Sequence, residues 1–370
     1  MDTNPINIAD FETLARARME ASLFDFYAGG SEDEVTLRRN RAAFENLLLK
    51  PRYLRDVGTR TLVTRVLGQQ ISFPILLAPT GYQKLVCQEG ELAVARAAAS
   101  CGTIMVASTV SDYSLEDIAR EGKGPLWFQL YCYSERRISE WLIRRAEKAG
   151  YTALCLTIDV PVLGRRERDL HNRFNLLDLN VRNLSIATEM ELPGGLQAAE
   201  VLPYQAAHFD PRLTWEDVAW IRSLTSLPLV IKGILTPEDA HLAVEYGAAG
   251  IVVSNHGGRQ LDGVPASIEV LPEIMAAVGN RVEVLLDGGI RRGTDILKAL
   301  ALGAKAVLLG RPFLWGLAVN GEHGVRQVLE ILQTELDTAL ALVGLCSLQE
   351  VDSNVLYHPW ELAPTHPFGQ

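Results

Sequence analysis

A histidine and an arginine that could act together on a small acid lie close in the chain, as His256 and Arg259, separated by two glycines. Imidazole titrates near neutral pH and can take up a proton, and the planar guanidinium group grips a carboxylate through two parallel hydrogen bonds. Arg166 offers a second guanidinium group, and Asp159 could orient a histidine and stabilise its protonated form. These residue types predict a base that titrates near neutral pH beside groups that bind a carboxylate, and a structural histidine is the alternative for His256. The alternative role for Asp159 is a structural salt bridge. The alternative for the charged run 165–169 is a solvent-exposed face with no part in binding.

Two further stretches are typical of phosphate binding. Residues 287–291 read Asp-Gly-Gly-Ile-Arg, and Gly310 directly precedes Arg311. Glycines let backbone N–H groups approach an anion, a helix that begins at Gly293 would add partial positive charge, and arginines neutralise phosphate directly. Tight turns that merely need glycine are the alternative, but we predict that the two stretches together hold a phosphate group.

A lysine ends an otherwise apolar segment at Lys232. Burying an unpaired charge there would be costly, so we expect this lysine to have an anionic partner. It either forms a Schiff base with a carbonyl substrate or offsets negative charge that develops on a cofactor. The residues alone leave both roles open.

These residues follow the ends of eight short apolar segments, which we interpret as strands buried on both faces of a parallel sheet. Helical patterns lie between them, with N-terminal caps expected at Ser134 and Thr236. The alternation predicts an α/β fold, a (β/α)8 TIM barrel, in which functional residues gather at the C-terminal ends of the strands. The predicted strands are Ile75–Pro79, Ile104–Ser108, Leu126–Leu130, Ala153–Asp159, Leu229–Lys232, Gly250–Ser254, Val284–Asp287 and Ala306–Gly310, and the helices are Glu89–Ala99, Ser134–Ala149, Pro237–Tyr246, Ile268–Val278 and Gly293–Leu302.

The fourth and fifth predicted strands end 73 residues apart, whereas the other neighbouring strand ends are 22 to 33 residues apart. The extra stretch, residues 160–213, leaves the barrel from the end where active sites form, so we predict a lid-like insertion. Its Pro193-Gly194-Gly195 run favours a mobile loop, and a plain linker is the alternative. We expect a single domain over residues 1–370, whose other parts are a helical segment over 1–70 (helices over 8–21 and up to 48), a C-terminal helix over Gly324–Leu345 and a Pro-rich tail over 357–370.

The composition limits the partners of the chain. Its 370 residues include 35 Lys and Arg against 45 Asp and Glu, a net charge of -10, which argues against nucleic acid. No apolar run approaches the roughly 20 residues of a membrane helix, and the polar N-terminus lacks a signal-peptide pattern, so we expect a cytoplasmic protein without a membrane anchor. The five cysteines contain no C-x-x-C pair, which argues against a disulfide framework and a zinc site, and no metal is expected.

From about Ile8 to Leu356 the sequence resembles the family of FMN-dependent α-hydroxy-acid oxidases and dehydrogenases. The likeness rests on the runs 254–262 and 287–291, on Gln-Leu-Tyr at 129–131 and on Gly-Arg-Arg at 164–166. The first of these runs is the most specific. Within the family the chain is most similar to cyanobacterial lactate and glycolate oxidases, with a weaker likeness to 4-hydroxymandelate oxidases.

The resemblance implies catalytic roles for several residues. His256 would take a proton from a 2-hydroxy acid while a hydride equivalent passes to flavin N5, and Asp159 would stabilise the imidazolium that forms. Arg259 and Arg166 would hold the substrate carboxylate. Tyr131 would hydrogen-bond the hydroxyl or developing carbonyl oxygen of the substrate.

The resemblance also implies FMN as the cofactor. Lys232 would lie beside flavin N1 and stabilise the anionic reduced ring, the second of the two roles left open above. The residues implied along the flavin ring and ribityl chain are Pro79, Thr80, Gly81, Ser108, Gln129, Thr157 and Ser254, and those at the phosphate are Gly289, Arg291, Gly310 and Arg311. Asp287, Gly288 and Ile290 are further cofactor-binding residues that the resemblance implies.

Phe24, Tyr82 and Val110 complete the substrate pocket that the resemblance implies. Many family members have tyrosine where this chain has Phe24, and loss of that hydrogen bond to the carboxylate costs about 1 kcal/mol. Glycolate oxidases have tryptophan near the position of Val110, so the smaller valine leaves room beside the second carbon of the substrate. We therefore expect lactate and larger apolar or aromatic 2-hydroxy acids to be better substrates than glycolate.

The leading hypothesis is an (S)-2-hydroxy-acid oxidase that forms a 2-oxo acid and reduces O2 to hydrogen peroxide. A lactate or mandelate dehydrogenase that uses FMN and a quinone or protein acceptor is the alternative within the family. More remote alternatives are a flavin-free enzyme that uses Lys232 as a Schiff base on a sugar phosphate, and a non-catalytic barrel. The chain ends without the Ser-Lys-Leu peroxisomal signal of eukaryotic relatives, and the resemblance implies a homotetramer or octamer.

Overall fold

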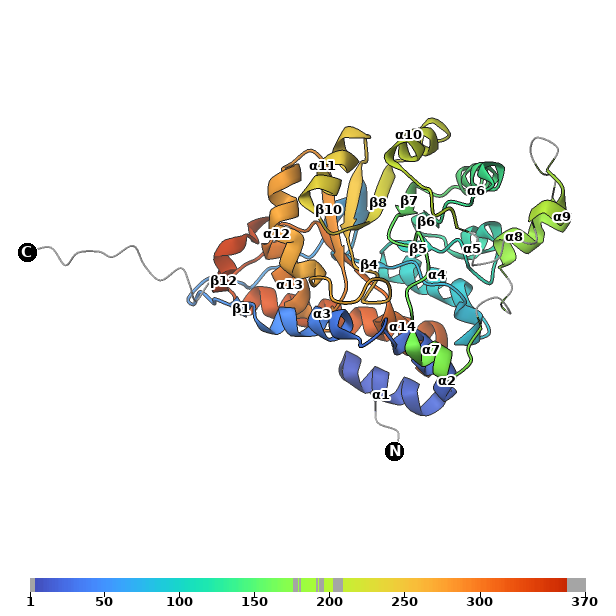
Figure 1. Ribbon diagram of the computed structural model, residues 1–370. Coiled ribbons are helices and arrows are strands. Elements are labelled where there is room, and N and C mark those ends of the chain that lie inside the picture. The colour runs from blue at the N-terminus through green and yellow to red at the C-terminus, as the bar shows by residue number, and fades with distance from the viewer. Residues whose placement is uncertain are drawn as a thin grey trace, which may run out of the picture.

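The protein is built around a closed barrel of eight parallel strands, which confirms the predicted fold (Figure 1). The computed structural model describes residues 4–175, 179, 181–190, 192, 196–201 and 209–357. Around the barrel the strand order is β10-β11-β4-β5-β6-β7-β8-β9. The strands are β4 (Ile75–Leu77), β5 (Met105–Ala107), β6 (Leu126–Leu130), β7 (Ala153–Thr157), β8 (Leu229–Ile234), β9 (Gly250–Val253), β10 (Glu283–Asp287) and β11 (Ala306–Leu309).

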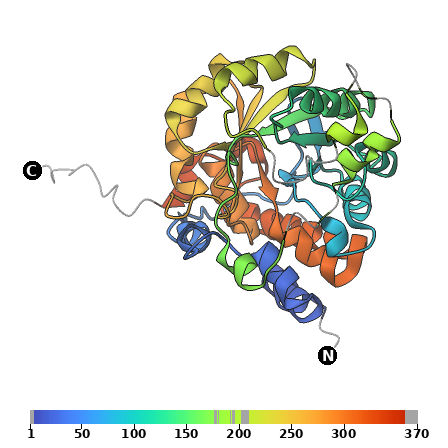
Figure 2. The same ribbon diagram turned by 45° about the vertical axis from the view of Figure 1, so that its right-hand side comes forward.

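One helix follows each strand and packs on the outside of the barrel, so that Figure 2 shows a ring of helices around the strands. Thr236 caps its helix as predicted, because its hydroxyl accepts from the Asp239 N–H at 3.2 Å. The cap predicted at Ser134 is wrong: Glu135 precedes the helix, and its carboxylate accepts from the Arg137 N–H. The helices are α4 (Gly90–Cys101), α5 (Leu115–Glu121), α6 (Arg136–Lys148), α10 (Trp215–Ser223), α11 (Pro237–Glu245), α12 (Ser267–Val278), α13 (Gly293–Ala301) and α14 (Arg311–Leu342).

Side chains alternate along each strand between two buried environments. In β9, Val252 packs inside the barrel, whereas Ile251 and Val253 pack outward against the helices. The hairpin of β2 (Thr64–Val66) and β3 (Gln69–Ile71) adds Val66 and Ile71 to the interior cluster. The hairpin thereby closes the N-terminal end of the barrel, which leaves the C-terminal strand ends for a site.

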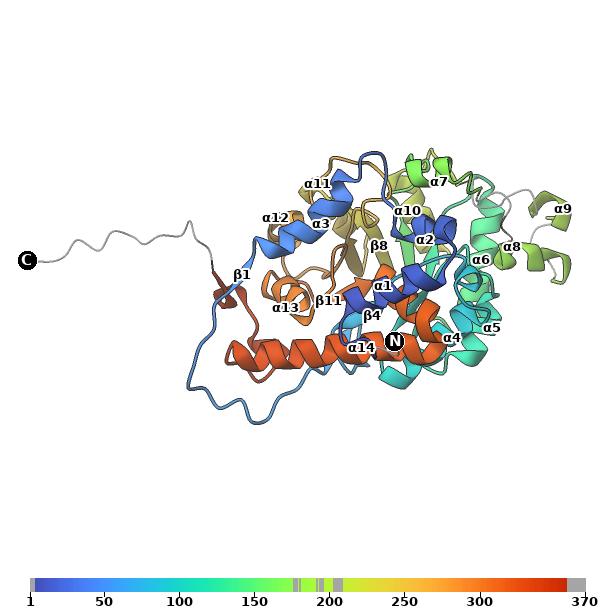
Figure 3. The ribbon, with the colours of Figure 1, turned by 90° about the horizontal axis from the view of Figure 1, so that it is seen from below.

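The N-terminal segment forms three helices, α1 (Ile8–Arg18), α2 (Ala21–Ala28) and α3 (Val35–Glu45). The predicted helix over 8–21 is too long, since the backbone is extended at Met19 and a new helix begins at Ala21. Figure 3 shows α1 lying along α14. After these helices, β1 (Leu48–Leu49) pairs antiparallel with β12 (Leu356–Tyr357), the last strand of the described chain.

The last helix, α14, begins earlier than predicted, directly after β11 at Arg311 rather than at Gly324. Its regular backbone is interrupted at Asn320 and Gly321, where Gly321 has a φ of 55°. The sequence pattern predicted a helix start near this break, because only the part of α14 after Gly321 carries a long uninterrupted amphipathic repeat.

The insertion after β7 contains short helices: α7 (Glu167–His171), α8 (Arg182–Ser185), η3 (Ile186–Thr188) and α9 (Ala198–Val201). Helix α7 packs beside α2, whereas α8 and α9 lie at the outer edge near α5 and α6 (Figure 1). Leu184 and Val201 are fully buried, so part of the insertion is packed on the barrel. The predicted Pro193-Gly194-Gly195 loop lies outside the described residues, as does the tail beyond Tyr357.

Among the described residues no helix is long and apolar enough to cross a membrane. All five cysteines are free thiols, of which Cys132 and Cys155 are buried.

Candidate active site

A cleft of about 1180 Å³, including its open mouth, lies at the C-terminal end of the barrel. It brings together side chains from seven of the strand ends and from the insertion that follows the eighth, β7. The predicted residues that line it are Pro79, Thr80, Gly81, Tyr82, Ser108, Val110, Tyr131, Arg166, Lys232, His256, Arg259, Asp287, Gly288, Gly289, Ile290, Arg291, Gly310 and Arg311.

The loop after β9 holds His256 against the strand end of β7. His256 Nδ1 lies 2.8 Å from Asp159 Oδ1, and the His256 N–H donates to Ser254 Oγ at 3.1 Å. Burial lowers the pKa of His256 below its usual value, and the negative charge of Asp159 offsets this only in part. Burial opposes ionisation of Asp159, but the charges of His256 and Lys232 lower its pKa below the usual value. The histidine is therefore neutral at pH 7 beside an ionised carboxylate.

Lys232, on β8, has the anionic partner that its position predicts. Its Nζ lies 3.2 Å from Asp287 Oδ2 and donates to Ser254 Oγ at 2.9 Å. Burial works against the charge, but Asp287 and Asp159 raise the pKa of Lys232 above its usual value. A Schiff-base lysine must lose its proton before it attacks, so this environment argues against the sugar-phosphate alternative.

Four arginines point their charges toward the cleft: Arg166, Arg259, Arg291 and Arg311. None of them has a carboxylate oxygen within 4.0 Å among the described residues, although most of the other arginines do. Burial lowers the pKa of Arg291 to about 10, and burial with the charge of Arg291 lowers the pKa of Arg311 to about 9. Four partly buried cations without protein anions form a site for anionic ligands.

The C-terminal end of α2 holds two of these arginines. Arg259 Nη1 donates to the carbonyl oxygens of Phe26 at 2.7 Å and Gly29 at 2.9 Å. Arg311 donates through Nε to the carbonyl of Tyr27 at 2.8 Å and through Nη2 to that of Gly29 at 2.9 Å. Carbonyl groups at a helix C-terminus carry partial negative charge, so they hold the arginines without neutralising them. In Arg259 the Nη2 group keeps no hydrogen-bond partner within the described chain.

The helix N-terminus that faces the cleft is that of α14, at Gly310 and Arg311, rather than the predicted one at Gly293. The first turn of α13 is already occupied, because the Gly293 N–H donates to Glu335 Oε2 at 2.8 Å and the Arg292 N–H to Asp295 Oδ2 at 3.0 Å. A Cβ added at Gly310 would meet open space, so this glycine leaves room above the helix start.

The structure corrects one predicted substrate contact. Phe24 does not line the cleft; its ring stacks on Trp315 with centroids 5.0 Å apart, and Arg16 lies over its face. Phe26, two positions further along α2, lines the cleft instead, stacked on Phe174 with Arg259 5.3 Å above its ring. Residues two apart in a helix face nearly opposite directions, so an error of two positions moves the apolar wall to the wrong face.

Some cleft residues were not predicted from the sequence. Val160, Leu163 and Phe209 enter from the insertion, and Phe209 stacks on Tyr131 with centroids 4.3 Å apart. The insertion offered a signal for the first two, since they directly follow a strand end. Phe209 offered none, because no periodic pattern surrounds it.

The cleft fits FMN by an observation independent of the arginines. Gln129 Nε2, Thr157 Oγ1 and Asp287 Oδ1 are buried without a hydrogen-bond partner among the described residues, and they lie at the ends of β6, β7 and β10. Buried polar atoms without partners are rare in proteins, so these atoms suit a ligand with several hydrogen-bond donors and acceptors. Ser254 is committed to Lys232 and His256, and it supports the site from behind.

A parallel barrel that gathers a neutral histidine, a charged lysine and four arginines without carboxylate partners among the described residues has the makings of an enzyme that acts on anionic ligands. A family model described as FMN-dependent dehydrogenase matches residues 15–358. The chain belongs to this family, and FMN is its cofactor.

Named relatives agree with this assignment. The chain is 52% identical over 360 residues to an L-lactate oxidase from Nostoc sp., covering 96% of this chain and 99% of the relative. It is 46% identical to the glycolate oxidase of Spinacia oleracea, covering 96% of both chains. Among solved structures, a mandelate oxidase with (S)-4-hydroxymandelic acid is 46% identical with a TM-score of 0.87, covering 95% of this chain and 98% of that one. A soluble mutant of the membrane-associated (S)-mandelate dehydrogenase from Pseudomonas putida is 42% identical with a TM-score of 0.89, covering 96% and 99%.

Proposed function

We propose that the protein is an (S)-2-hydroxy-acid oxidase that converts an L-2-hydroxy acid to the 2-oxo acid and reduces O2 to hydrogen peroxide. The observation that carries the proposal is the pairing of His256 with Asp159 in the same cleft as Arg166 and Arg259, two cations without carboxylate partners. A substrate that has a hydroxyl group on the carbon next to its carboxylate would contact all four side chains.

The proton is taken up at one definite atom. His256 Nδ1 donates to Asp159, so the lone pair of Nε2 is the one left to accept the hydroxyl proton of the substrate. Asp159 then faces an imidazolium at 2.8 Å and stabilises it. FMN bound in the cleft supplies the acceptor for the two electrons of the oxidation.

Two groups bind the rest of the substrate. Arg166 and Arg259 hold its carboxylate, and Arg166 Nε has no hydrogen-bond partner among the described residues. Burial and the charge of Asp159 raise the pKa of Tyr131 to about 12, so its phenol keeps its proton and donates to the substrate oxygen. The Tyr82 hydroxyl, which is buried without a hydrogen-bond partner among the described residues, is a second donor in the cleft beside Tyr131. Lys232 stays protonated and offsets negative charge beside it.

The wall beside the substrate side chain favours apolar acids. Val110 and Phe26 line it, and neither offers a hydrogen bond to a side chain. We therefore propose L-lactate or larger apolar and aromatic 2-hydroxy acids as better substrates than glycolate, with Phe26 in the wall position expected for Phe24.

Anaerobic reduction followed by mixing with air tests the proposal. The purified protein should show flavin absorption near 370 and 450 nm, which bleaches with L-lactate or L-mandelate. Recovery of the absorption within the turnover time on mixing with air supports an oxidase. Bleaching with slow recovery, and fast recovery with a quinone, would assign the dehydrogenase alternative. Absence of bleaching with every 2-hydroxy acid would refute the proposal altogether.

A further inference from the structure

Asn183, on α8, is a buried polar side chain by which the insertion after β7 contacts the barrel. Asn183 is fully buried, although α8 lies at the outer edge of the molecule near α5 and α6 (Figure 1). Its neighbour Arg182 is exposed in part and pairs with Glu189 on the same short segment, at 2.8 Å. Only one of these two adjacent side chains therefore reaches the barrel.

The amide of Asn183 satisfies every one of its hydrogen-bonding groups on a single loop. Its Nδ2 donates to the carbonyl of Thr109 at 3.0 Å, to Ser111 Oγ at 2.9 Å and more weakly to the carbonyl of Ser108 at 3.4 Å. Its Oδ1 accepts from the Leu115 N–H at 3.0 Å, at the start of α5. A buried amide with all partners in place holds that loop in one position.

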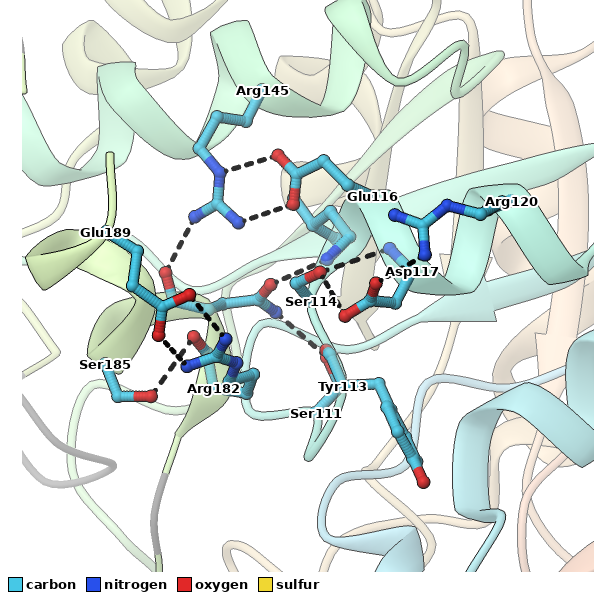
Figure 4. A network of polar contacts seen from close by, with 12 residues as sticks. Ser111, Tyr113, Ser114, Glu116, Asp117, Arg120, Arg145, Arg182, Ser185 and Glu189 are labelled. Carbon is cyan, nitrogen blue, oxygen red and sulfur yellow. Dashed lines mark hydrogen bonds and ion pairs between the residues drawn. The ribbon is translucent and has the colours of Figure 1, made fainter. Parts of the chain in front are cut away.

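Arg145, on α6, fixes the backbone of Asn183 in turn, and Figure 4 shows Arg145 facing Glu116 of α5. Its Nη1 donates to the Asn183 carbonyl at 2.7 Å, while Nε and Nη2 form two parallel bonds with Glu116 at 2.9 and 2.8 Å. The Arg145 side chain is 4% exposed and lies over the ring of Trp141. Helix α8 is thus held in place by residues of α5 and α6. The Asn183 side chain in turn holds the loop over residues 108–111.

The loop that Asn183 holds forms a wall of the cleft. Ser108 and Val110 line the cleft, and the Val110 carbonyl accepts from the Tyr82 N–H at 3.2 Å. A Cβ added at Gly81 would lie 2.5 Å from Val110 Cγ2, so the wall packs tightly against the neighbouring strand end. A shift of the loop changes the space beside the substrate and moves Tyr82 with it.

We propose that Asn183 is a positioning residue that sets the substrate selectivity of the cleft from outside the barrel, by fixing the wall at Val110. This inference rests on the proposed function. Loss of its two N–H donors frees the loop, and Val110 no longer holds a fixed position beside a small side chain such as that of lactate. A bulky aromatic side chain depends less on that contact, because it fills the widened space itself.

The test compares Asn183→Asp with a matched control, Arg182→Ala. Asn183→Asp keeps the shape and the acceptor for Leu115 but removes both donors, whereas Arg182→Ala removes only the exposed pair with Glu189. We expect kcat/KM for L-lactate relative to L-mandelate to fall at least about fivefold in Asn183→Asp, the factor of one net hydrogen bond. The control keeps the wild-type ratio. Ser111→Ala, which removes one of the acceptors, should give a smaller change in the same direction.

A double-mutant cycle with Val110→Ala separates positioning from general stability. If Asn183 acts through Val110, Asn183→Asp changes the ratio much less in the Val110→Ala background than in the wild type. An unchanged ratio in both Asn183→Asp and Ser111→Ala, or fully additive effects in the cycle, would overturn the inference, whatever their melting temperatures. Failure of the proposed function looks different, since the wild-type protein itself would then oxidise neither acid.

Discussion

Replacement of Asp159 by asparagine tests the electrostatic core of the site. Asp159 contacts His256 at 2.8 Å, and both side chains are at least four-fifths buried, with 12% and 20% exposed. A hydrogen bond between charged partners at such a site is worth about 1.5 to 3 kcal/mol, which corresponds to a factor of about 10 to 100 in rate. We expect kcat of Asp159→Asn to fall by this factor, because the imidazolium loses its counter-charge.

The same substitution should move the pH profile in a definite direction. His256 must be neutral to accept a proton, so kcat/KM is lost as the pH falls through its pKa, which burial already places below the usual value. The charge of Asp159 raises that pKa, so its removal lowers the pKa further and shifts the acid limb of kcat/KM to lower pH, by about one to two units for the energy given above. The variant is thus slower at neutral pH and less sensitive to acid.

The assay is anaerobic flavin bleaching by L-lactate in a stopped-flow instrument, from pH 4.5 to 9. Asp210→Asn is a matched control, because Asp210 pairs with Arg212 outside the lining of the cleft. A kcat of Asp159→Asn within threefold of the wild type, or an acid limb that stays in place or moves to higher pH, would refute the reasoning.

His256→Ala should keep FMN bound, seen by its absorption, and lower turnover by about 10²- to 10⁴-fold, and near-normal turnover would remove His256 as the base. Arg259→Lys should raise KM for every 2-hydroxy acid, because lysine cannot form two parallel hydrogen bonds with a carboxylate; an unchanged KM and kcat/KM would exclude it as the clamp. Val110→Trp should lower kcat/KM for L-mandelate by about 10- to 100-fold and affect glycolate much less, and equal losses for both acids would place Val110 away from the side chain.

The barrel was predictable because its signals are local. Each strand is a short apolar run that ends in residues of unusual chemistry, and a parallel barrel collects all such ends on one rim. His256, Arg259 and Lys232 could therefore be assigned to one site without knowing any distance between them. The sequence predicted that Lys232 has an anionic partner but not which residue it is, and the structure shows that it is Asp287.

The parts that failed depend on contacts between distant segments. Whether Phe24 or Phe26 faces the cleft follows from where α2 begins, and a two-residue gap after α1 determines that start. The predicted helix N-terminus at Gly293 was wrong as the anion site because Glu335, far along the chain, occupies it. Asn183 carried no signal at all, since an asparagine in an irregular stretch reads as an ordinary turn residue.

The bond from Arg311 to the carbonyl of Tyr27 spans 284 residues of sequence. A contact between residues so far apart in sequence is expected to form late in folding, because closing the long loop between them costs entropy before the bond can stabilise the fold. During synthesis the ribosome must release Arg311 before α2 can be held over the barrel, and β11 must close against β4 at the same stage. A product that ends before β11 therefore lacks Arg311, one of the cleft cations, and leaves the C-terminal end of α2 without this contact.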